Sequence, residues 1–254
     1  MKKISILGYG NVACILGTKL QASGFFVDKV WGRDATKARA FATSIKAGVA
    51  NDVSELAASD IVIIAVSDAA IQRVSDLLPE TDALVVHTSG MIEMDLLKQH
   101  KRRGVFYPLQ TLTKDFLVPF TEVPFLLESK QADDMALLKE LASGMGSTCY
   151  EMNSDIRKHV HLSAVFVNNF ANHLFSIASN LLQEKQLPLE ILHPLMRQTV
   201  DKAIALSPQD IQTGPAKRGD IDTINQHLAL LSKYPEYNKI YEVLSESIRN
   251  RYKN

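Results

Sequence analysis

Two glycines near the start of the chain have the spacing of a backbone site for phosphate. They stand in GYGNVA (8–13), which follows the apolar run ISIL (4–7) and leads into a pattern of apolar residues at helical spacing. Gly8 allows a tight turn, and Gly10 lets a pyrophosphate approach the N–H groups at the helix start, where the helix dipole favours an anion. Ala13 replaces the third glycine of the dinucleotide fingerprint and still lets helix and strand pack closely. We therefore predict that a dinucleotide binds Gly8, Tyr9, Gly10, Asn11, Val12 and Ala13.

The end of the second predicted strand, FFVDKVW (25–31), is expected to contact the ribose of the adenosine. In NAD proteins a carboxylate at this place accepts hydrogen bonds from the 2′-hydroxyl. Asp28 lies at the expected distance from Gly8, but the strand continues to Trp31, which puts Asp28 in mid-strand. Arg33 follows the strand and can pair with a 2′-phosphate through its planar guanidinium. The sequence thus favours NADP over NAD, with Asp34 as an alternative partner for a 2′-hydroxyl.

Two further strand ends are expected to line the same crevice, because ligands of open α/β sheets bind beyond the carboxyl ends of the strands. The segments AVSD (65–68) and HTSG (87–90) each end a buried strand. His87 is either an acid–base group or, as is commoner for a histidine at a strand end, a structural hydrogen-bonding group. The nicotinamide ribose is predicted to be surrounded by Ala65, Val66, Ser67, Ser89 and Gly90.

A polar stripe on a later helix offers chemistry that the glycine turn lacks. Reduction of a carbonyl or imine needs a proton donor beside the cofactor. In RKHVHLSAVFVNNFANHLF (157–175), a step of about 100° per residue puts His161, Asn168 and Asn172 on one side of an otherwise apolar helix. Such polar groups cost stability unless they meet partners or a ligand. His161 is predicted to donate the proton and the asparagines to orient the substrate; a structural interdomain role for His161 is the alternative.

A glycine and proline turn, TGPAKRGD (213–220), carries two cations ahead of another helical pattern. Arg218 is predicted to hold a carboxylate of the substrate, because its guanidinium matches carboxylate geometry. Solvation of Arg218 and Lys217 is the alternative. Asp220 or Asp222 is expected to cap the helix that follows.

These residues require an α/β scaffold followed by a helical one. Up to residue 152 short β-rich runs alternate with helical patterns, which predicts a doubly wound, mostly parallel sheet covered on both faces. After Met152 no β-like run occurs. We predict a dinucleotide-binding domain over residues 1–152 and an all-helical substrate and dimerisation domain over 153–254. The expected strands are 4–8, 25–31, 61–66, 83–88, 104–108, 124–128 and 148–152.

The first helix of the second part is expected over about 155–185, capped by Asn153 or Ser154. Its length is too great to hide all apolar faces within a domain of about 100 residues. A homodimer through those faces is therefore expected, and a monomer that wraps them around its own sheet is the alternative. Further helices are predicted after Pro188, before Lys233 and after Pro235.

The composition excludes several classes of partner. Lys plus Arg and Asp plus Glu number 28 each, so no overall field attracts nucleic acid or an anionic membrane. No apolar run approaches the roughly 20 residues of a membrane span. Cys14 and Cys149 lack metal-type spacing and are expected to be reduced core residues. The expected class is a soluble, cytoplasmic protein that holds no metal and acts on a small molecule.

The order of the motifs resembles one bacterial family. GYGNVA, the Arg33 loop, AVSD, HTSG, YPLQT (107–111), NNFANHL (168–174) and TGPAKRGDIDTINQHL (213–228) are together similar to Rossmann-like NADP oxidoreductases whose C-terminal half is catalogued only as a domain of unknown function, number 2520. More distantly the chain is similar to pyrroline-5-carboxylate reductases, ketopantoate reductases and 3-hydroxyisobutyrate dehydrogenases, in which a Rossmann domain precedes a helical domain resembling that of 6-phosphogluconate dehydrogenase. Similarity to the 3-hydroxyisobutyrate dehydrogenases would imply a catalytic lysine at residue 161, where this chain has a histidine.

Three functions are compatible with these features. The first is an NADP-dependent reductase of a small carboxylated carbonyl or imine, with hydride delivered in a cleft between the two domains. The second is a dinucleotide-binding sensor or partner protein without catalysis, which the missing lysine favours. The third is hydride exchange with a deazaflavin, as one branch of related folds performs, and no residue of this chain selects it.

Overall fold

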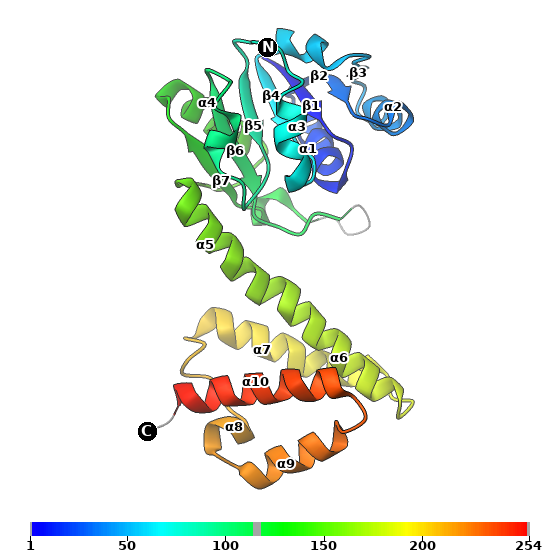
Figure 1. The fold of residues 1–254 in the computed structure, drawn as a ribbon, viewed down its shortest axis with the longest axis vertical. Helices are drawn as coiled ribbons and strands as arrows, with labels where there is room; N and C mark the ends of the chain where they lie inside the picture. The colour runs from blue at the N-terminus through cyan, green and yellow to red at the C-terminus, as the bar shows by residue number, and fades with distance from the viewer. Residues whose placement is uncertain (1, 114–117, 253–254) are drawn as a thin grey trace. The chain divides into compact units, whose positions relative to one another are not determined.

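The computed structural model describes residues 2–113 and 118–252. The chain divides into two compact units, Met1–Val167 and Asn168–Asn254. Each unit is described by itself below (Figure 1).

The first unit is built on one sheet of eight strands. Their order is β3-β2-β1-β4-β5-β6-β7-β8, and β1 to β6 pair in parallel. β7 pairs with β6 in the antiparallel sense and with β8 in parallel, so the last two strands run against the others. The strands are β1 (Lys3–Leu7), β2 (Phe26–Trp31), β3 (Gly48–Val49), β4 (Ile61–Ile64), β5 (Leu84–His87), β6 (Arg103–Pro108), β7 (Phe125–Ser129) and β8 (Cys149–Glu151).

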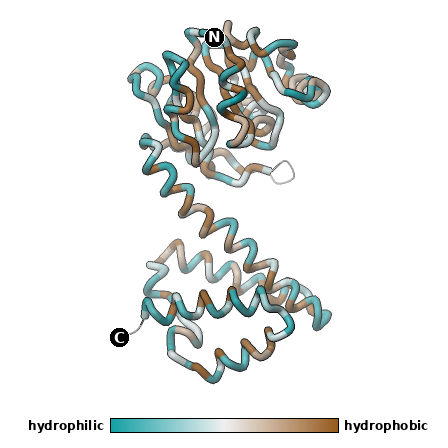
Figure 2. The backbone as a smooth tube through the Cα atoms, viewed as in Figure 1, coloured by the Kyte–Doolittle hydropathy of each residue, from teal (hydrophilic) through white to brown (hydrophobic). Residues whose placement is uncertain are grey.

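Helices cover both faces of this sheet. The helices α1 (Asn11–Ala22), α2 (Ala35–Ser44) and α4 (Ala132–Gly144) share one apolar core with one face of the strands, whereas α3 (Asp68–Ser75) belongs to the core on the other face. Alternation along the strands creates the two cores, because Ile61 and Ile63 face one and Val62 and Ile64 the other. Figure 2 shows the strands as the most hydrophobic part of this unit. Short 3₁₀ helices lie at Val53–Ala58, Met94–Leu97 and Phe120–Glu122.

A helical stretch begins after β8, where the Asn153 side chain accepts the backbone N–H of Ile156 at 2.9 Å. It comprises α5 (Ser154–Ala164), a π-helical segment (Val165–Phe170) and α6 (Ala171–Gln183). The wider π turns change the angle between successive side chains, so the 100° step behind the predicted stripe does not apply across residues 165–170. The boundary between the two compact units falls inside this π-helical segment.

The second unit is helical throughout its described part. Besides α6 it contains a 3₁₀ turn (Leu189–Leu192), α7 (His193–Ala205), α8 (Pro215–Arg218), α9 (Ile221–Leu230) and α10 (Pro235–Arg251). Helix α10 contacts α8 and α9, and polar pairs such as His227 Nδ1 with the Tyr241 hydroxyl, at 2.7 Å, join the helices. Asp220 caps α9 by accepting the N–H of Thr223 at 3.0 Å, as one of the two predicted alternatives.

The predicted fold class is confirmed, with a mostly parallel sheet flanked by helices and a helical C-terminal part. Each of the seven predicted strands is present, and β3 is additional. Cys14 and Cys149 are free thiols that are half-buried at the edge of the core. Within the described residues, none of the helices combines the length and the apolar character that a membrane span requires.

Candidate active site

The glycine turn forms the floor of a cavity of about 610 Å³ at the carboxyl ends of β1, β4 and β5. Gly8 has φ +132°, and a Cβ there would lie 2.1 Å from the carbonyl oxygen of Ala65, so only glycine fits. A Cβ on Gly10 would meet no protein atom within 4 Å. Gly10 is the N-cap of α1, and no side chain caps that helix. Its first N–H groups therefore suit a pyrophosphate, which is the fit that the fingerprint predicts.

The end of β2 brings a cation to this cavity. Arg33 is exposed and lines the cavity beside Gly32. Asp34 instead caps α2, where its Oδ1 accepts the N–H groups of Thr36 and Lys37, each at 3.1 Å. Those hydrogen bonds hold the pKa of Asp34 below its usual value, and the one from the backbone N–H of Lys37 contributes most. The Asp34 carboxylate is thus occupied at the start of α2, whereas the Arg33 side chain lines the cavity.

The ends of β4 and β5 supply the opposite wall. The predicted residues Ala65, Val66, Ser67, Ser89 and Gly90 all line the cavity, and so do Asp68 and Thr88. His87 does not line it. The His87 side chain is fully buried, and its Nδ1 accepts the N–H of Ser89 at 3.2 Å. Burial, followed by the nearby Arg157 charge, lowers the pKa of His87 to about 3. His87 is therefore a neutral structural group, the second of the two alternatives for this residue.

A tyrosine and a histidine close the far end of the cavity. The Tyr107 hydroxyl lies 2.9 Å from Nδ1 of His161, and both side chains are half-buried cavity residues. Tyr107 comes from β6 and His161 from α5, and their rings meet edge to face with centroids 5.9 Å apart. The pair places two groups that can exchange protons beside the glycine turn. The sequence indicated His161 and offered Tyr107 as a candidate proton donor of the first domain, but it did not show that the two side chains would meet.

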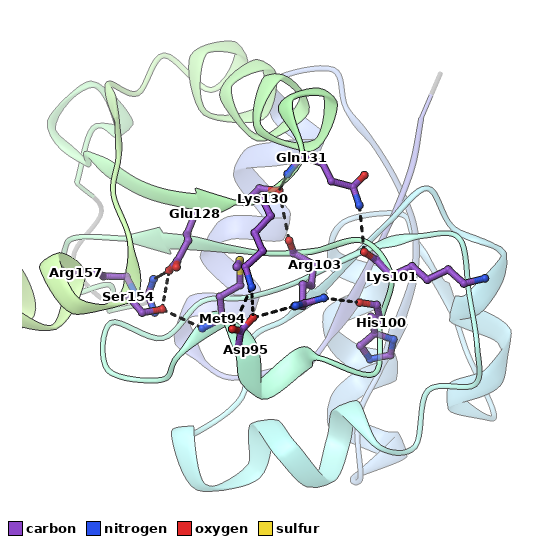
Figure 3. Close-up of polar contacts among 11 residues, drawn as sticks. Met94, Asp95, His100, Lys101, Arg103, Glu128, Lys130, Gln131, Ser154 and Arg157 are labelled. Carbon is purple, nitrogen blue, oxygen red and sulfur yellow. Dashed lines mark hydrogen bonds and ion pairs between the residues drawn. The ribbon is translucent and has the colours of Figure 1, made fainter.

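Helix α5 is fixed to the sheet by a buried arginine one turn before His161. Arg157 is completely buried, and its guanidinium donates to Glu128 on β7, to the backbone oxygen of Ile92 and to Oγ of Ser154. Ser154 donates in turn to Glu128 at 2.8 Å (Figure 3). A buried pair of this kind is costly to break, because the remaining charge has no partner. The anchor holds α5 where His161 can reach β6.

A network of exposed charges continues along the same edge of the sheet. Asp95 accepts hydrogen bonds from Arg103 on β6 and from Lys130 after β7, each at 3.0 Å (Figure 3). The Lys130 and Arg103 cations, in that order, hold the pKa of Asp95 below its usual value. These contacts fix the 3₁₀ helix Met94–Leu97 and thereby the segment that follows Gly90.

The other predicted catalytic residues lie in the second unit. Asn168 falls in the π-helical segment and Asn172 in α6. Arg218 ends α8, and its side chain is 64% exposed with the Asp220 carboxylate at 3.8 Å. None of these three residues lines the cavity described above. Among residues 2–113 and 118–252, no group of three His, Cys, Asp or Glu side chains is arranged to hold a metal ion.

A second cavity, of about 720 Å³, lies between α1, α2 and the segment Val118–Phe120. Its walls are mainly apolar, as at Ile15, Ala40 and Phe41. It shares Tyr9 and Leu112 with the first cavity but contains neither glycine of the turn nor the Tyr107–His161 pair. The first cavity therefore carries the candidate chemistry.

Two family models match the chain. Residues 3–89 match the model described as NADP oxidoreductase, coenzyme F420-dependent, and residues 123–248 match domain of unknown function 2520. No curated protein matches the chain.

Solved structures match it over nearly its whole length. A Bacteroides fragilis protein, described provisionally as an NADP oxidoreductase, is 36% identical with a TM-score of 0.88, and 98% of each chain is covered. A reductive aminase from Aspergillus terreus, in complex with cyclohexanone and allyl amine, is 16% identical with a TM-score of 0.77, over 97% of this chain and 93% of the aminase. An imine reductase from Myxococcus stipitatus in complex with NADP⁺ is 16% identical with a TM-score of 0.71, over 98% and 93%.

The two reductases share the fold, and the Bacteroides relative shows the family. The glycine turn, the Arg33 end of β2 and the models that match both parts of the chain agree with it. The chain thus belongs to the NADP oxidoreductases that carry domain of unknown function 2520, and it is an oxidoreductase that uses NADP.

Proposed function

We propose that the protein reduces the C=O or C=N bond of a small carboxylated substrate with NADPH. One observation carries this proposal: the proton-exchanging pair Tyr107 and His161 lines the same cavity as the glycine turn, and every lining residue belongs to the first unit. NADPH, when bound, supplies the hydride. His161 is the source of the proton that the substrate oxygen or nitrogen needs, because one imidazole nitrogen can donate a proton while the other accepts one.

The cofactor would lie along the cavity from Arg33 to Gly90. The turn amides would hold the pyrophosphate, and Arg33 would pair with the 2′-phosphate. Other lining residues would pack against the cofactor, namely Tyr9, Asn11, Val12, Ala65, Val66, Ser67 and Ser89. Ala13, which was predicted to join them, is fully buried in the core and does not line the cavity.

The second unit would serve the substrate and the assembly. We keep the sequence-based assignments that Asn168 and Asn172 orient the substrate, that Arg218 holds its carboxylate, and that residues 153–254 are the substrate and dimerisation domain. Exposed apolar side chains on α7 support a homodimer, since Leu195, Val200 and Ile204 are 60%, 50% and 81% exposed. We also place the protein in the cytoplasm.

The test is oxidation of NADPH, followed by absorbance, with a panel of small keto acids and cyclic imines and with cyclohexanone plus allyl amine. We expect turnover of at least one member, with NADH a poorer donor. Replacing His161 by Ala should lower kcat by about 100-fold or more, the scale of lost general acid catalysis, while the Kd of NADPH stays within about twofold. Equal loss of turnover and NADPH affinity, or loss of neither, would contradict this role.

The absence of the lysine that the hydroxyisobutyrate dehydrogenases use favours a second candidate, an NADP-binding sensor or partner protein without catalysis. A sensor would bind NADPH but oxidise none of it with any member of the panel.

A further inference from the structure

The contact between Tyr107 and His161 allows the two residues to play different roles in proton transfer. The Tyr107 hydroxyl and Nδ1 of His161 are 2.9 Å apart, so one of them donates a hydrogen bond to the other. Nε2 of the same imidazole is not used in this contact. A tyrosine bonded to Nδ1 can therefore pass a proton onward while the imidazole exchanges protons through Nε2.

The backbone at the end of β5 holds this pair against the cavity. A Cβ on Gly90 would lie 2.5 Å from Nδ1 of His161 and 2.9 Å from Cζ of Tyr107. Gly90 itself lines the cavity, as do both members of the pair. A bound substrate that reaches Gly90 would thus meet the atoms that share the proton.

The surroundings keep the phenol protonated. Burial, and next the Asp68 carboxylate, raise the pKa of Tyr107, which the Arg157 charge opposes. Charged or titratable groups that face the pair from other elements include Asp68 and Arg33, which line the same cavity, and Lys158 and His159 line a small surface hollow together with His161. A neutral phenol is a proton donor throughout the working range of the enzyme, but it needs a second group to restore its proton.

We propose that the Tyr107 hydroxyl is the catalytic group that delivers the proton to the substrate, and that His161 returns a proton to it through Nδ1. This inference rests on the proposed function. As the substrate carbon accepts the hydride that NADPH supplies, its nitrogen or oxygen takes the phenolic proton. The O–H bond of Tyr107 breaks, and His161 gives its Nδ1 proton to the phenolate while its unprotonated Nε2 takes a proton from water, so one proton enters the imidazole as one leaves it. Proton exchange with water then returns His161 to the tautomer that carries its proton on Nδ1.

A first arm of the test measures protons without any substrate. Calorimetric titration with NADP⁺ and with NADPH, in phosphate and in Tris between about pH 5.5 and pH 8, gives the protons released on binding. The oxidised nicotinamide ring carries a positive charge that the reduced ring lacks, so NADP⁺ binding beside the Tyr107–His161 pair should release more protons than NADPH binding. His161→Asn should abolish this difference in proton release between NADP⁺ and NADPH. Tyr107→Phe should change how the difference varies with pH, because Nδ1 of His161 loses its hydrogen-bond partner. An unchanged difference in His161→Asn would overturn the proposal.

A second arm measures turnover of cyclohexanone plus allyl amine and of pyruvate. Tyr107→Phe should lower kcat by about 100-fold or more and leave the Kd of NADPH within about twofold. His161→Asn should lower kcat less at low pH than at high pH, because solvent can then reprotonate Tyr107. The exposed Tyr150 gives the matched control, and Tyr150→Phe should match the wild type.

The outcomes separate the two claims. Failure of the wild-type protein to bind either form of NADP contradicts the proposed function itself. NADPH binding with kcat of Tyr107→Phe within twofold of the wild type overturns only the assignment to Tyr107. If no tested substrate turns over, the first arm still decides whether His161 exchanges a proton in response to the charge of the nicotinamide ring, and an unchanged proton release in His161→Asn overturns the proposal.

Discussion

A Cβ atom on Gly90 would lie 2.5 Å from Nδ1 of His161, closer than any real Cβ approaches a nitrogen. Gly90 lies in the segment after β5 and His161 lies in α5, 71 positions further along the sequence. Their approach is possible because residue 90 has no side chain, and it lets the imidazole reach the Tyr107 hydroxyl. The absence of a side chain at residue 90 is thus a condition for the candidate proton-transfer pair.

Replacing Gly90 by Ala should separate this pair. The added methyl group must displace one of the two rings, and overpacking of this kind costs about 1–3 kcal/mol. We expect a lower melting temperature, measured by circular dichroism. In a His161→Ala background, Gly90→Ala should lower the free energy of unfolding less, because the imidazole that lies nearest to the added methyl group is absent. Equal losses in both backgrounds would show that the Gly90–His161 contact is not the obstacle.

The two glycines of the turn should respond differently to substitution. Gly8→Ala must distort the fold, because its Cβ would lie 2.1 Å from the Ala65 oxygen and φ is +132°. Gly10→Ala should leave the melting temperature near that of the wild type and weaken NADP binding, since its Cβ would occupy space open to the pyrophosphate. Thermal unfolding and calorimetry measure the two effects. Normal NADP affinity in Gly10→Ala would place the pyrophosphate elsewhere.

The Arg157 anchor should matter far more to stability than the neighbouring surface pair. Arg157→Ala removes the cation that faces Glu128, whose side chain is only 13% exposed, and should cost about 3–5 kcal/mol in the free energy of unfolding. Lys158→Ala breaks a pair with Glu93 whose side chains are 32% and 63% exposed, and should cost about 0–1 kcal/mol. Urea unfolding of both variants tests the contrast, and similar losses would argue against a structural anchor.

His87 should make the protein less stable as the pH falls. Its pKa is about 3 when folded against 6.5 as the ordinary value, so between these limits the unfolded chain binds a proton that the folded chain does not. The free energy of unfolding should therefore fall by about 1.4 kcal/mol per pH unit from this group. His87→Asn keeps an acceptor for the Ser89 N–H and should lose this dependence, so it should gain on the wild type from about pH 6.5 toward pH 4.5. Parallel stability curves would contradict a buried neutral His87. His100, whose pKa burial also lowers, is common to both proteins.

Local signals in the sequence were sufficient for much of the fold. The caps at Asn153 and Asp220 depend on residues within three positions, and the glycine turn depends on strand and helix next to it. β3 was missed because two residues, Gly48 and Val49, are too short for an alternation pattern. The reversed direction of β7 also escaped prediction, since it depends on pairing across the sheet.

Long-range contacts account for the rest of the site. Tyr107 and His161 are 54 positions apart, and no local pattern joins them. Nothing in the local sequence around Arg157 indicates that its partner is Glu128, which lies 29 positions earlier. The π-helical segment has no signature in apolar periodicity, so the stripe of Asn168 and Asn172 was drawn with a regular helical step.

Calorimetric titration of the cofactor-stripped protein with NADP⁺ and NAD⁺ shows whether the glycine turn binds a dinucleotide and which one it prefers. We expect one NADP⁺ per chain and weaker NAD⁺ binding. Arg33→Ala should weaken NADP⁺ binding by about 10-fold or more through loss of a charge-assisted contact, and it should change NAD⁺ binding little. Arg39→Ala, in the helix α2 that follows, should bind both dinucleotides like the wild type. Absence of saturable heat with either dinucleotide would contradict NADP binding, because the glycine turn would then hold no pyrophosphate.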